Sequence, residues 1–288
     1  MSTLLIAGTT ASGKSSLAIE LAIRYDAVIV SADAMTVYKG LDVGTAKPSL
    51  DEQAAAPHLG LDLREIDQPF DVSDFVALVE GAQERHSRVI IAGGTTFWLS
   101  ALIRPLAPLP PSDPDVRARL EAIQDPHRAL AEVDPVAAAR LHPNDRVRVV
   151  RALEVFHLTG ETQTSIHAKG PRREPMDANV IWLDRDDLRE RIDLRLSQMQ
   201  EAGYLDETQR ALETDPLART KPLQSFAYRH IIDHARGDTT LDEAIRRTSR
   251  DTWQYARKQR TWARNLGWAR SERRDIEELA KATFERRA

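Results

Sequence analysis

The stretch "GTTASGKSS", residues 8 to 16, stands directly behind an apolar run and directly ahead of a helical pattern. It matches G-x-x-x-x-G-K-[ST], a loop whose glycines allow backbone N–H groups to surround phosphate oxygens. The helix that follows points its positive end at the same anion. The loop therefore predicts a diphosphate or triphosphate ligand, without specifying ATP. The expected diphosphate-binding residues are Gly8, Thr9, Thr10, Ala11, Ser12, Gly13, Lys14 and Ser15.

The last two side chains of this loop add further functions. Lys14 supplies a point charge beside the phosphates, and the hydroxyl of Ser15 is suited to hold Mg²⁺ there. We therefore expect Mg²⁺ as a cofactor, with Ser15 as its protein ligand.

Apolar, β-branched runs predict a parallel sheet around this loop. They cover residues 4–7, 27–30, 89–92 and 180–183. Helical patterns at 15–24 and 72–85 separate the first three, which is the alternation of an α/β fold. We expect a P-loop NTPase-like parallel sheet flanked by helices. Because the carboxyl ends of parallel strands share one edge, Asp33 and Thr95, which follow two of the strands, should lie near the phosphate.

A proline-rich stretch, "PLAPLPPSDP" at residues 105–114, interrupts the alternation of strands and helices. Helical patterns follow at 115–123, 126–133, 135–141 and 144–158, and Asn144-Asp145 is the expected N-cap of the last one. We therefore expect a helical insertion domain in an α/β core. The domains are then 1–110 for the first part of the core, 111–175 for the insertion, and 176–288 for the return strand and C-terminal helices.

Composition narrows the class of protein. The chain has 288 residues, no cysteine and a formal net charge of −4, so it has neither a disulfide framework nor a thiolate metal site. No apolar run reaches the length of a membrane span, and we expect a cytoplasmic enzyme without membrane contact. Residues 219–274 differ from the rest, because they hold fourteen basic and six acidic residues. Such a basic segment suggests a large polyanionic partner.

The basic residues of this segment follow a helical stripe between residues 241 and 266. Arg250, Arg257, Arg260 and Arg264 recur at spacings of three, four and seven around Trp253, opposite a face of mostly small or apolar residues. The stripe could be a solvated charged face. The lack of acidic residues to pair with it favours a contact surface for nucleic-acid phosphates.

Five longer stretches are more specific than the phosphate loop alone. They are "SADAMTVYKGLDVGTAKPS" (31–49), "PHLGLDL" (57–63), "AGGTTFWLSAL" (92–102), "EVDPVAAARLHPNDRVRVVRALEVFHLTG" (132–160) and "RDTWQYARKQRTWARN" (250–265). Together they resemble the tRNA dimethylallyltransferases, also called tRNA isopentenyltransferases, and the resemblance runs from the N-terminus to about Trp268. In that family the P-loop binds the diphosphate of dimethylallyl diphosphate, and the prenyl group is transferred to N6 of the adenosine immediately 3′ of the anticodon.

The resemblance implies roles for individual residues. Asp33 matches the family's general base, which accepts the proton of the attacking amine. Thr95 matches a threonine beside this base and the adenine. The implied partners are dimethylallyl diphosphate and the anticodon stem-loop of tRNA, without an obligate protein partner. The implied tRNA contacts are Asp33, Ala34, Met35, Thr36, Lys47, Thr95, Arg117, Val147, Arg148, Val149, Val150 and Arg151.

The chain also departs from the family pattern. The family commonly reads Asp-Ser-Met-Gln where this chain has Asp33-Ala34-Met35-Thr36, so an amide suited to reading adenine is missing. Arg146-Val147-Arg148 replaces Pro-Gln-Arg, Ala227-Tyr228 replaces Gly-Tyr, and Gly94-Thr95-Thr96-Phe97-Trp98 replaces Gly-Thr-Gly-Leu-Tyr. These changes affect acceptor recognition rather than the diphosphate site. A small-molecule kinase and a prenyltransferase for free adenine nucleotide are the alternative functions.

Overall fold

The computed structural model describes residues 2–285 and divides the chain into two compact units. The first unit consists of Met1–Ile103 and Asp177–Ala288, and the second of Arg104–Met176. The residues that the sequence sets apart as an insertion, 111–175, lie within the second unit.

A five-stranded sheet forms the centre of the first unit. All of its neighbouring strands are parallel, and their order is β3-β2-β4-β1-β5. The predicted α/β class with a parallel sheet is confirmed. The short β3 was not expected, because two residues carry no readable pattern. The strands are β1 (Ser2–Gly8), β2 (Val28–Ser31), β3 (His58–Leu59), β4 (Arg88–Gly93) and β5 (Asn179–Leu183).

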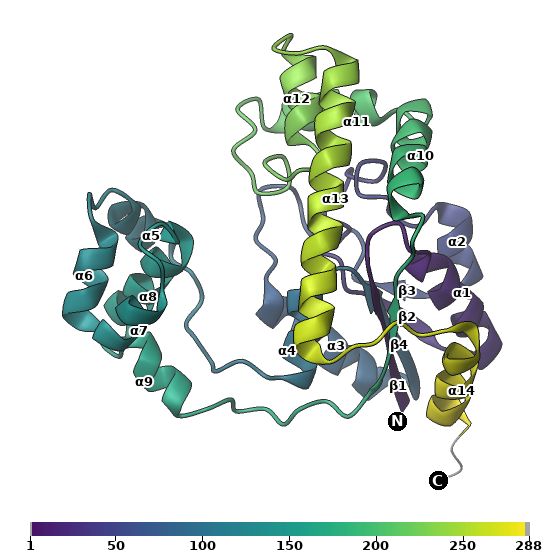
Figure 1. Ribbon diagram of the computed structural model, residues 1–288, viewed down its shortest axis with the longest axis horizontal. Helices are drawn as coiled ribbons and strands as arrows, with labels where there is room; N and C mark the ends of the chain where they lie inside the picture. Colours follow the sequence, from purple (N-terminus) through teal and green to yellow (C-terminus); the bar gives the residue numbers. More distant parts are fainter. Residues whose placement is uncertain (1, 286–288) are drawn as a thin grey trace. The chain divides into compact units, whose positions relative to one another are not determined.

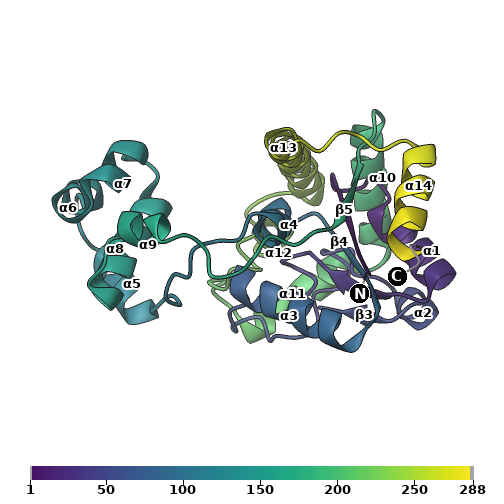
Figure 2. The same ribbon diagram turned by 90° about the horizontal axis from the view of Figure 1, so that it is seen from below.

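Helices cover both faces of this sheet. On one face, Leu4 and Ile6 of β1 pack with residues of α1 (Lys14–Tyr25) and α14 (Arg273–Phe284). On the other face lie α3 (Val72–Arg85), α4 (Thr96–Ile103) and the 26-residue α13 (Leu241–Leu266). Figure 2 shows α1 and α14 on one side of the sheet and α4 and α13 on the other. The strands are buried on both faces, which explains their continuous apolar runs.

Three helices complete the first unit beyond the carboxyl ends of the strands. They are α10 (Leu188–Glu201), α11 (Tyr204–Thr214) and α12 (Arg229–Ala235), which Figure 1 shows at the end of the sheet opposite the N-terminus. The sequence does not predict them individually, since α10 buries only Leu188, Ile192 and Leu196 among many charged residues. The short α2 (Leu50–Ala55) precedes β3.

Five helices form the second unit: α5 (Pro114–Glu121), α6 (Pro126–Val133), α7 (Pro135–Arg140), α8 (Arg146–Thr159) and α9 (Gln163–Ala168). The first three begin with an Asp-Pro pair, in which aspartate caps the helix and proline occupies its first position. Asp145 alone caps α8. The core of this unit is apolar and includes Leu120, Leu130, Ala137, Val149, Val150 and Leu153. In neither unit does the described part of the chain contain a helix that could span a membrane.

Candidate functional site

A cavity of about 500 Å³ lies at the carboxyl ends of the strands in the first unit. Its wall contains the loop that follows β1, the turn after β2 and the turn after β4, as the parallel sheet predicted. The cavity therefore brings together Lys14, Asp33 and Thr95. Helices α10 and α13 and the loop 44–46 close its remaining sides.

The phosphate loop, residues 8–15, has the backbone that its sequence predicts. A Cβ atom on Gly8 would lie 2.4 Å from the carbonyl oxygen of Leu183, and Gly13 has a φ of +96°, so both positions require glycine. Ala11 also adopts a left-handed conformation, with φ +60°. Within residues 2–285, the N–H groups of Ala11, Gly13, Lys14 and Ser15 donate to no other protein group. They remain available to an anion.

Three cations surround this loop. The ammonium of Lys14 donates to the carbonyl oxygen of Thr9 at 2.6 Å, while Arg191 donates to that of Ala11 at 2.8 Å. Arg195 lies 3.4 Å from the hydroxyl of Thr10. Burial, together with the charge of Arg195, lowers the pKa of Lys14 to about 7 against an opposing effect of Asp33. A site in which a lysine is this difficult to charge is suited to a multiply charged anion.

Arg191 and Arg195 were missed by the sequence analysis. They lie four residues apart on α10 and so project from one face of it. Their spacing was visible in the sequence, but nothing in the sequence placed that face beside a loop 180 residues earlier.

Asp33 and Thr95 lie on adjacent turns that are joined directly. The N–H of Thr95 donates to the carbonyl oxygen of Ala32 at 3.1 Å, and the N–H of Ala34 donates to the hydroxyl of Thr95 at 3.0 Å. Burial raises the pKa of Asp33, while the N–H of Met35 and the charges of Lys14 and Arg195 oppose this rise. Asp33 is thus a carboxylate whose basicity is increased at the edge of a cationic cavity.

Helix α13 connects the phosphate loop to the turn that carries Thr95. The buried amide of Gln259 accepts from the N–H of Thr10 at 2.9 Å and donates to the carbonyl oxygen of Gly94 at 2.8 Å. The hydroxyl of Tyr255 donates to the same carbonyl oxygen at 3.0 Å. No local pattern singles out Gln259, because its two partners are distant in sequence.

The four arginines expected to contact tRNA from α13 do not share one environment. Arg260 forms a bidentate ion pair with Asp184, at 2.8 and 3.0 Å, and Asp184 accepts from the hydroxyl of Thr9 at 3.1 Å. Arg250 pairs with Asp251 at 3.2 Å. Arg257 and Arg264 are exposed, and none of the ion pairs in the described part of the chain includes them. Arg260 is therefore committed to the support of the phosphate loop.

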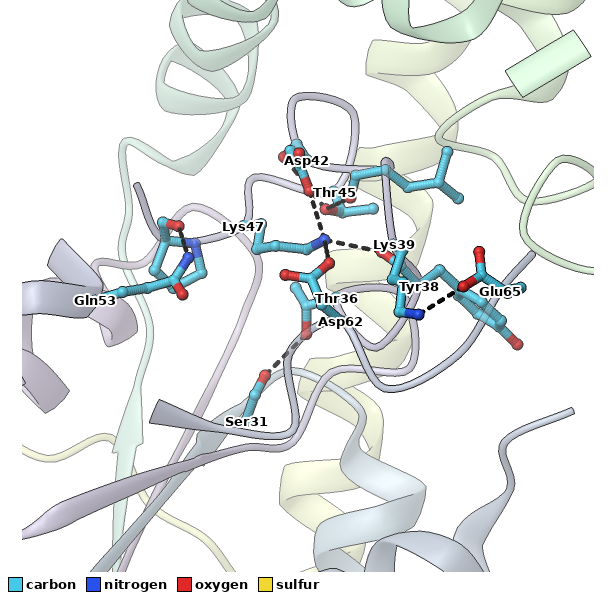
Figure 3. A network of polar contacts seen from close by, with 12 residues as sticks. Ser31, Thr36, Tyr38, Lys39, Asp42, Thr45, Lys47, Gln53, Asp62 and Glu65 are labelled. Atoms are coloured by element: carbon cyan, nitrogen blue, oxygen red, sulfur yellow. Dashed lines mark hydrogen bonds and ion pairs between the residues drawn. The ribbon is translucent and has the colours of Figure 1, made fainter. Parts of the chain in front are cut away.

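Lys47 was expected to contact tRNA, and the structure places it differently. Its side chain is only 3% exposed, and its ammonium donates to the carboxylates of Asp42 and Asp62 and to the carbonyl oxygen of Tyr38, at 2.5, 2.6 and 2.8 Å. Figure 3 shows these three contacts converging on the lysine. All three of its donors are used inside the protein, so the structure leaves no free donor on this lysine for the expected tRNA contact, which stays a prediction. The hydroxyl of Thr36, expected in the same role, is buried against Ser31 at 2.9 Å.

The expected tRNA contacts of the second unit also fall into different environments. Val147 is 68% exposed, whereas the side chains of Val149 and Val150 belong to the apolar core of this unit. The reason is helical: successive positions of α8 point in different directions. Arg151 pairs with the buried Glu154 at 2.6 Å.

Two further arginines of this unit are bound within it. Arg117 pairs with Glu121 at 3.1 Å, and Arg148 pairs with Asp145 while its side chain remains 73% exposed. Of the expected basic contacts in this unit, Arg148 is thus the one whose exposure suits a nucleic acid.

The donor groups of the cavity are compatible with Mg²⁺. Ser15 is exposed at the first turn of α1 and lines the cavity with Asp33. No group of three His, Asp or Glu side chains that could hold a metal occurs between residues 2 and 285. Mg²⁺ typically binds through few protein ligands together with substrate phosphates and water, and such a set is compatible with Ser15 and a diphosphate.

Comparison with known proteins gives a consistent picture. Residues 36–266 match the family described as IPP transferase. The chain is 41% identical to tRNA dimethylallyltransferase 1 of Trichlorobacter lovleyi over 275 residues, which cover 91% of this chain and 90% of that protein.

Solved structures agree in fold. The tRNA isopentenylpyrophosphate transferase of Bacillus halodurans superposes with a TM-score of 0.67 at 32% identity, over 98% of this chain and 95% of that one. A eukaryotic dimethylallyltransferase acting on tRNA superposes with a TM-score of 0.78 at 26% identity, over 91% and 70%.

Proposed function

The chain belongs to the IPP transferase family, and from that premise we propose that it transfers a dimethylallyl group to tRNA. The donor is dimethylallyl diphosphate, the acceptor is N6 of the adenosine immediately 3′ of the anticodon, and diphosphate is released. One observation carries the proposal: a single cavity contains an open anion-binding loop, the carboxylate of Asp33 and the hydroxyl of Thr95.

The reaction needs a proton acceptor, because an exocyclic adenine amine is a weak nucleophile. As N6 forms a bond to the first carbon of the dimethylallyl group, the bond from that carbon to the diphosphate oxygen breaks. The proton of N6 passes to Asp33. Burial raises the pKa of this carboxylate, which strengthens it as a base. Thr95, whose hydroxyl lies between the two turns, would orient the acceptor.

The leaving diphosphate gains negative charge as its bond to carbon breaks. Lys14 belongs to the phosphate loop, and Arg191 and Arg195 contact that loop from α10. The loop itself adds its open N–H groups. Fixed donors of this kind stabilise developing charge without reorganising during the reaction. Mg²⁺, held by Ser15 and the diphosphate, would add further stabilisation of the leaving group.

Each unit is proposed to contribute its own contacts to the tRNA. Arg257, Arg264 and Arg148 are the exposed basic residues that support this proposal. The target adenosine has to leave its loop to reach Asp33, as is usual for enzymes that modify a base. A tRNA acceptor agrees with the expected cytoplasmic location and requires no protein partner. A kinase or a prenyltransferase for free nucleotides would have no use for these residues, and the related proteins are named for tRNA.

The test is a reaction of the protein with unmodified tRNA, Mg²⁺ and either dimethylallyl diphosphate or ATP, followed by mass analysis of the nucleosides. We expect one adenosine per tRNA to gain a dimethylallyl group, only with dimethylallyl diphosphate. Transfer of phosphate from ATP, or prenylation of free AMP but not of tRNA, would refute the proposal.

A further inference from the structure

Loop 41–47 contributes to the wall of the cavity that also contains the phosphate loop, and a carboxylate from a helix distant in sequence holds its backbone. Gly44, Thr45 and Ala46 contribute to the cavity wall. Glu207 of α11 is 2% exposed and accepts from the N–H groups of Asp42, Val43 and Gly44, at 2.7, 2.7 and 2.9 Å. Three successive N–H groups aimed at one point form an anion site, and here the protein's own carboxylate fills it.

A fourth hydrogen bond to this carboxylate comes from a tyrosine. The hydroxyl of Tyr228 donates to Glu207 at 2.7 Å, so both carboxylate oxygens accept two hydrogen bonds. Gly44 leaves no room for a side chain, since a Cβ there would lie 2.6 Å from the ring of Tyr204 and 2.7 Å from that of Tyr228. At the other end of the loop, Lys47 makes the three contacts described above. The loop is therefore fixed at both ends before any substrate arrives.

Loop 41–47 has a strained backbone, which the contacts of Glu207 and Lys47 hold in place. Ala46 has a φ of +53°, a left-handed conformation that costs a residue with a Cβ about 1 kcal/mol. Such strain persists where the surroundings determine the conformation, and it concentrates at binding sites. Ala46 itself lines the cavity.

The position of the loop identifies the part of the donor that it borders. On α10, Arg195 lies at the phosphate loop, and Leu196 and Met199 line the cavity farther along the same helix. Four residues of helix span about 6 Å, so the cavity wall formed by α10 changes over that distance from cationic at Arg195 to apolar at Met199. Tyr204, next along the cavity wall, adjoins Gly44. The loop thus borders the apolar end.

We propose that loop 41–47 is a preorganised wall of the subsite for the alkenyl chain of the donor, and that Glu207 is the positioning residue that holds it. The proposal rests on the proposed function, since it takes a prenyl diphosphate as the ligand. Because loop 41–47 is already ordered, binding of the apolar chain does not lose free energy to ordering the loop. The loop contributes nothing to binding of the diphosphate alone.

The test compares Glu207→Gln with Glu213→Gln, the same substitution at an exposed position of the same helix. The amide of Glu207→Gln keeps one accepting oxygen and turns donors toward the N–H groups of the loop. We expect exchange of the amide hydrogens of residues 42–44 to accelerate about tenfold or more. Affinity for dimethylallyl diphosphate should fall about tenfold, while affinity for inorganic diphosphate changes less than about twofold. Glu213→Gln should match the wild type in all three measurements.

Tyr228→Phe provides a milder variant if Glu207→Gln does not fold, because it removes one of the four hydrogen bonds and leaves the charge. We expect intermediate effects in the same direction. Unchanged amide exchange in both variants, or equal loss of affinity for both ligands, would overturn the proposal, as would faster exchange with unchanged affinity for dimethylallyl diphosphate. Failure of the wild type to prenylate tRNA would instead refute the proposed function, and the exchange measurement would still test the contact of Glu207 with the loop.

Discussion

The phosphate loop and loop 41–47 use the same backbone device on different sides of one cavity. Each contains an alanine in the left-handed conformation, Ala11 with φ +60° and Ala46 with φ +53°, and each has several N–H groups that are not used by the surrounding backbone. In the phosphate loop these groups are open, whereas in loop 41–47 Glu207 fills the site. One loop is therefore a binding site, and the other is a fixed wall. The difference is the presence of an internal anion.

Asp33 and Glu207 provide the strongest test of this comparison. Glu207 accepts four hydrogen bonds, while Asp33 faces the cavity with a raised pKa and accepts from the N–H of Met35. Asp33→Asn should reduce the rate of prenyl transfer about 10²- to 10⁴-fold, because the proton acceptor is lost. Affinity for dimethylallyl diphosphate, measured by calorimetry, should change little. Loss of donor binding with normal residual chemistry would show that Asp33 binds metal or shapes the site.

Substitutions of Lys14 in the phosphate loop and Lys47 in loop 41–47 also test whether the two loops differ in function. Lys14→Met should weaken binding of inorganic diphosphate about 10²- to 10³-fold and reduce transfer accordingly, since a fixed charge on the open loop is lost. The free energy of unfolding of the Lys14→Met variant should not fall below that of the wild type, because burial penalises the charged form of this lysine. Lys47→Met should have the opposite profile, with little change in diphosphate affinity and a loss of about 2 kcal/mol in the free energy of unfolding.

Isothermal titration with inorganic diphosphate and urea unfolding of both variants check this prediction. If Lys47→Met weakened diphosphate binding as much as Lys14→Met, the two loops would not be separate in function.

The sequence predicted the open loop and not the filled one, for a physical reason. The phosphate loop is encoded by adjacent residues, and its pattern, strand and helix are read together. Loop 41–47 depends on Glu207, which lies more than 160 residues away, and on the rings of Tyr204 and Tyr228. The tRNA contact of Lys47 was implied by the family resemblance alone, and only the fold brings Asp42 and Asp62 around its ammonium.

The sheet and the cavity followed from patterns of buried strands, and the placement of Asp33 and Thr95 followed from the sheet being parallel. Their chemical roles stay predictions. The supporting residues Arg191, Arg195 and Gln259 could not be predicted, because helix packing brings them to the cavity and no local pattern records it.

The pH dependence of diphosphate binding gives a smaller effect with a defined sign. Lys14 has a pKa of about 7 in the free cavity, and the anion binds its charged form. Above that pH, binding must take up a proton, so affinity should fall with rising pH by up to about tenfold per pH unit. Titrations of wild type and Lys14→Met at several pH values, in the same buffer series, remove the titration of diphosphate itself by difference. Equal pH profiles would show that Lys14 stays charged in the free protein.

The smallest expected effects concern the support of the phosphate loop by a residue outside it, as Glu207 supports loop 41–47. Arg260 reaches Thr9 through Asp184, whereas Arg257 of the same helix has no such connection. Arg260→Ala should raise the KM for dimethylallyl diphosphate several-fold, because Thr9 loses a positioned partner. The dependence of tRNA affinity on salt should stay as in the wild type.

Arg257→Ala should give the reverse result. Each phosphate that a cation neutralises releases condensed counterions, so the slope of log affinity for tRNA against log salt should flatten by up to about one unit. The KM for dimethylallyl diphosphate should match the wild type. Steady-state kinetics and tRNA binding over a salt series measure both quantities on the same two proteins. If Arg260→Ala flattened the slope and left the KM unchanged, Arg260 would exchange Asp184 for tRNA, and the open loop would depend on its own backbone alone.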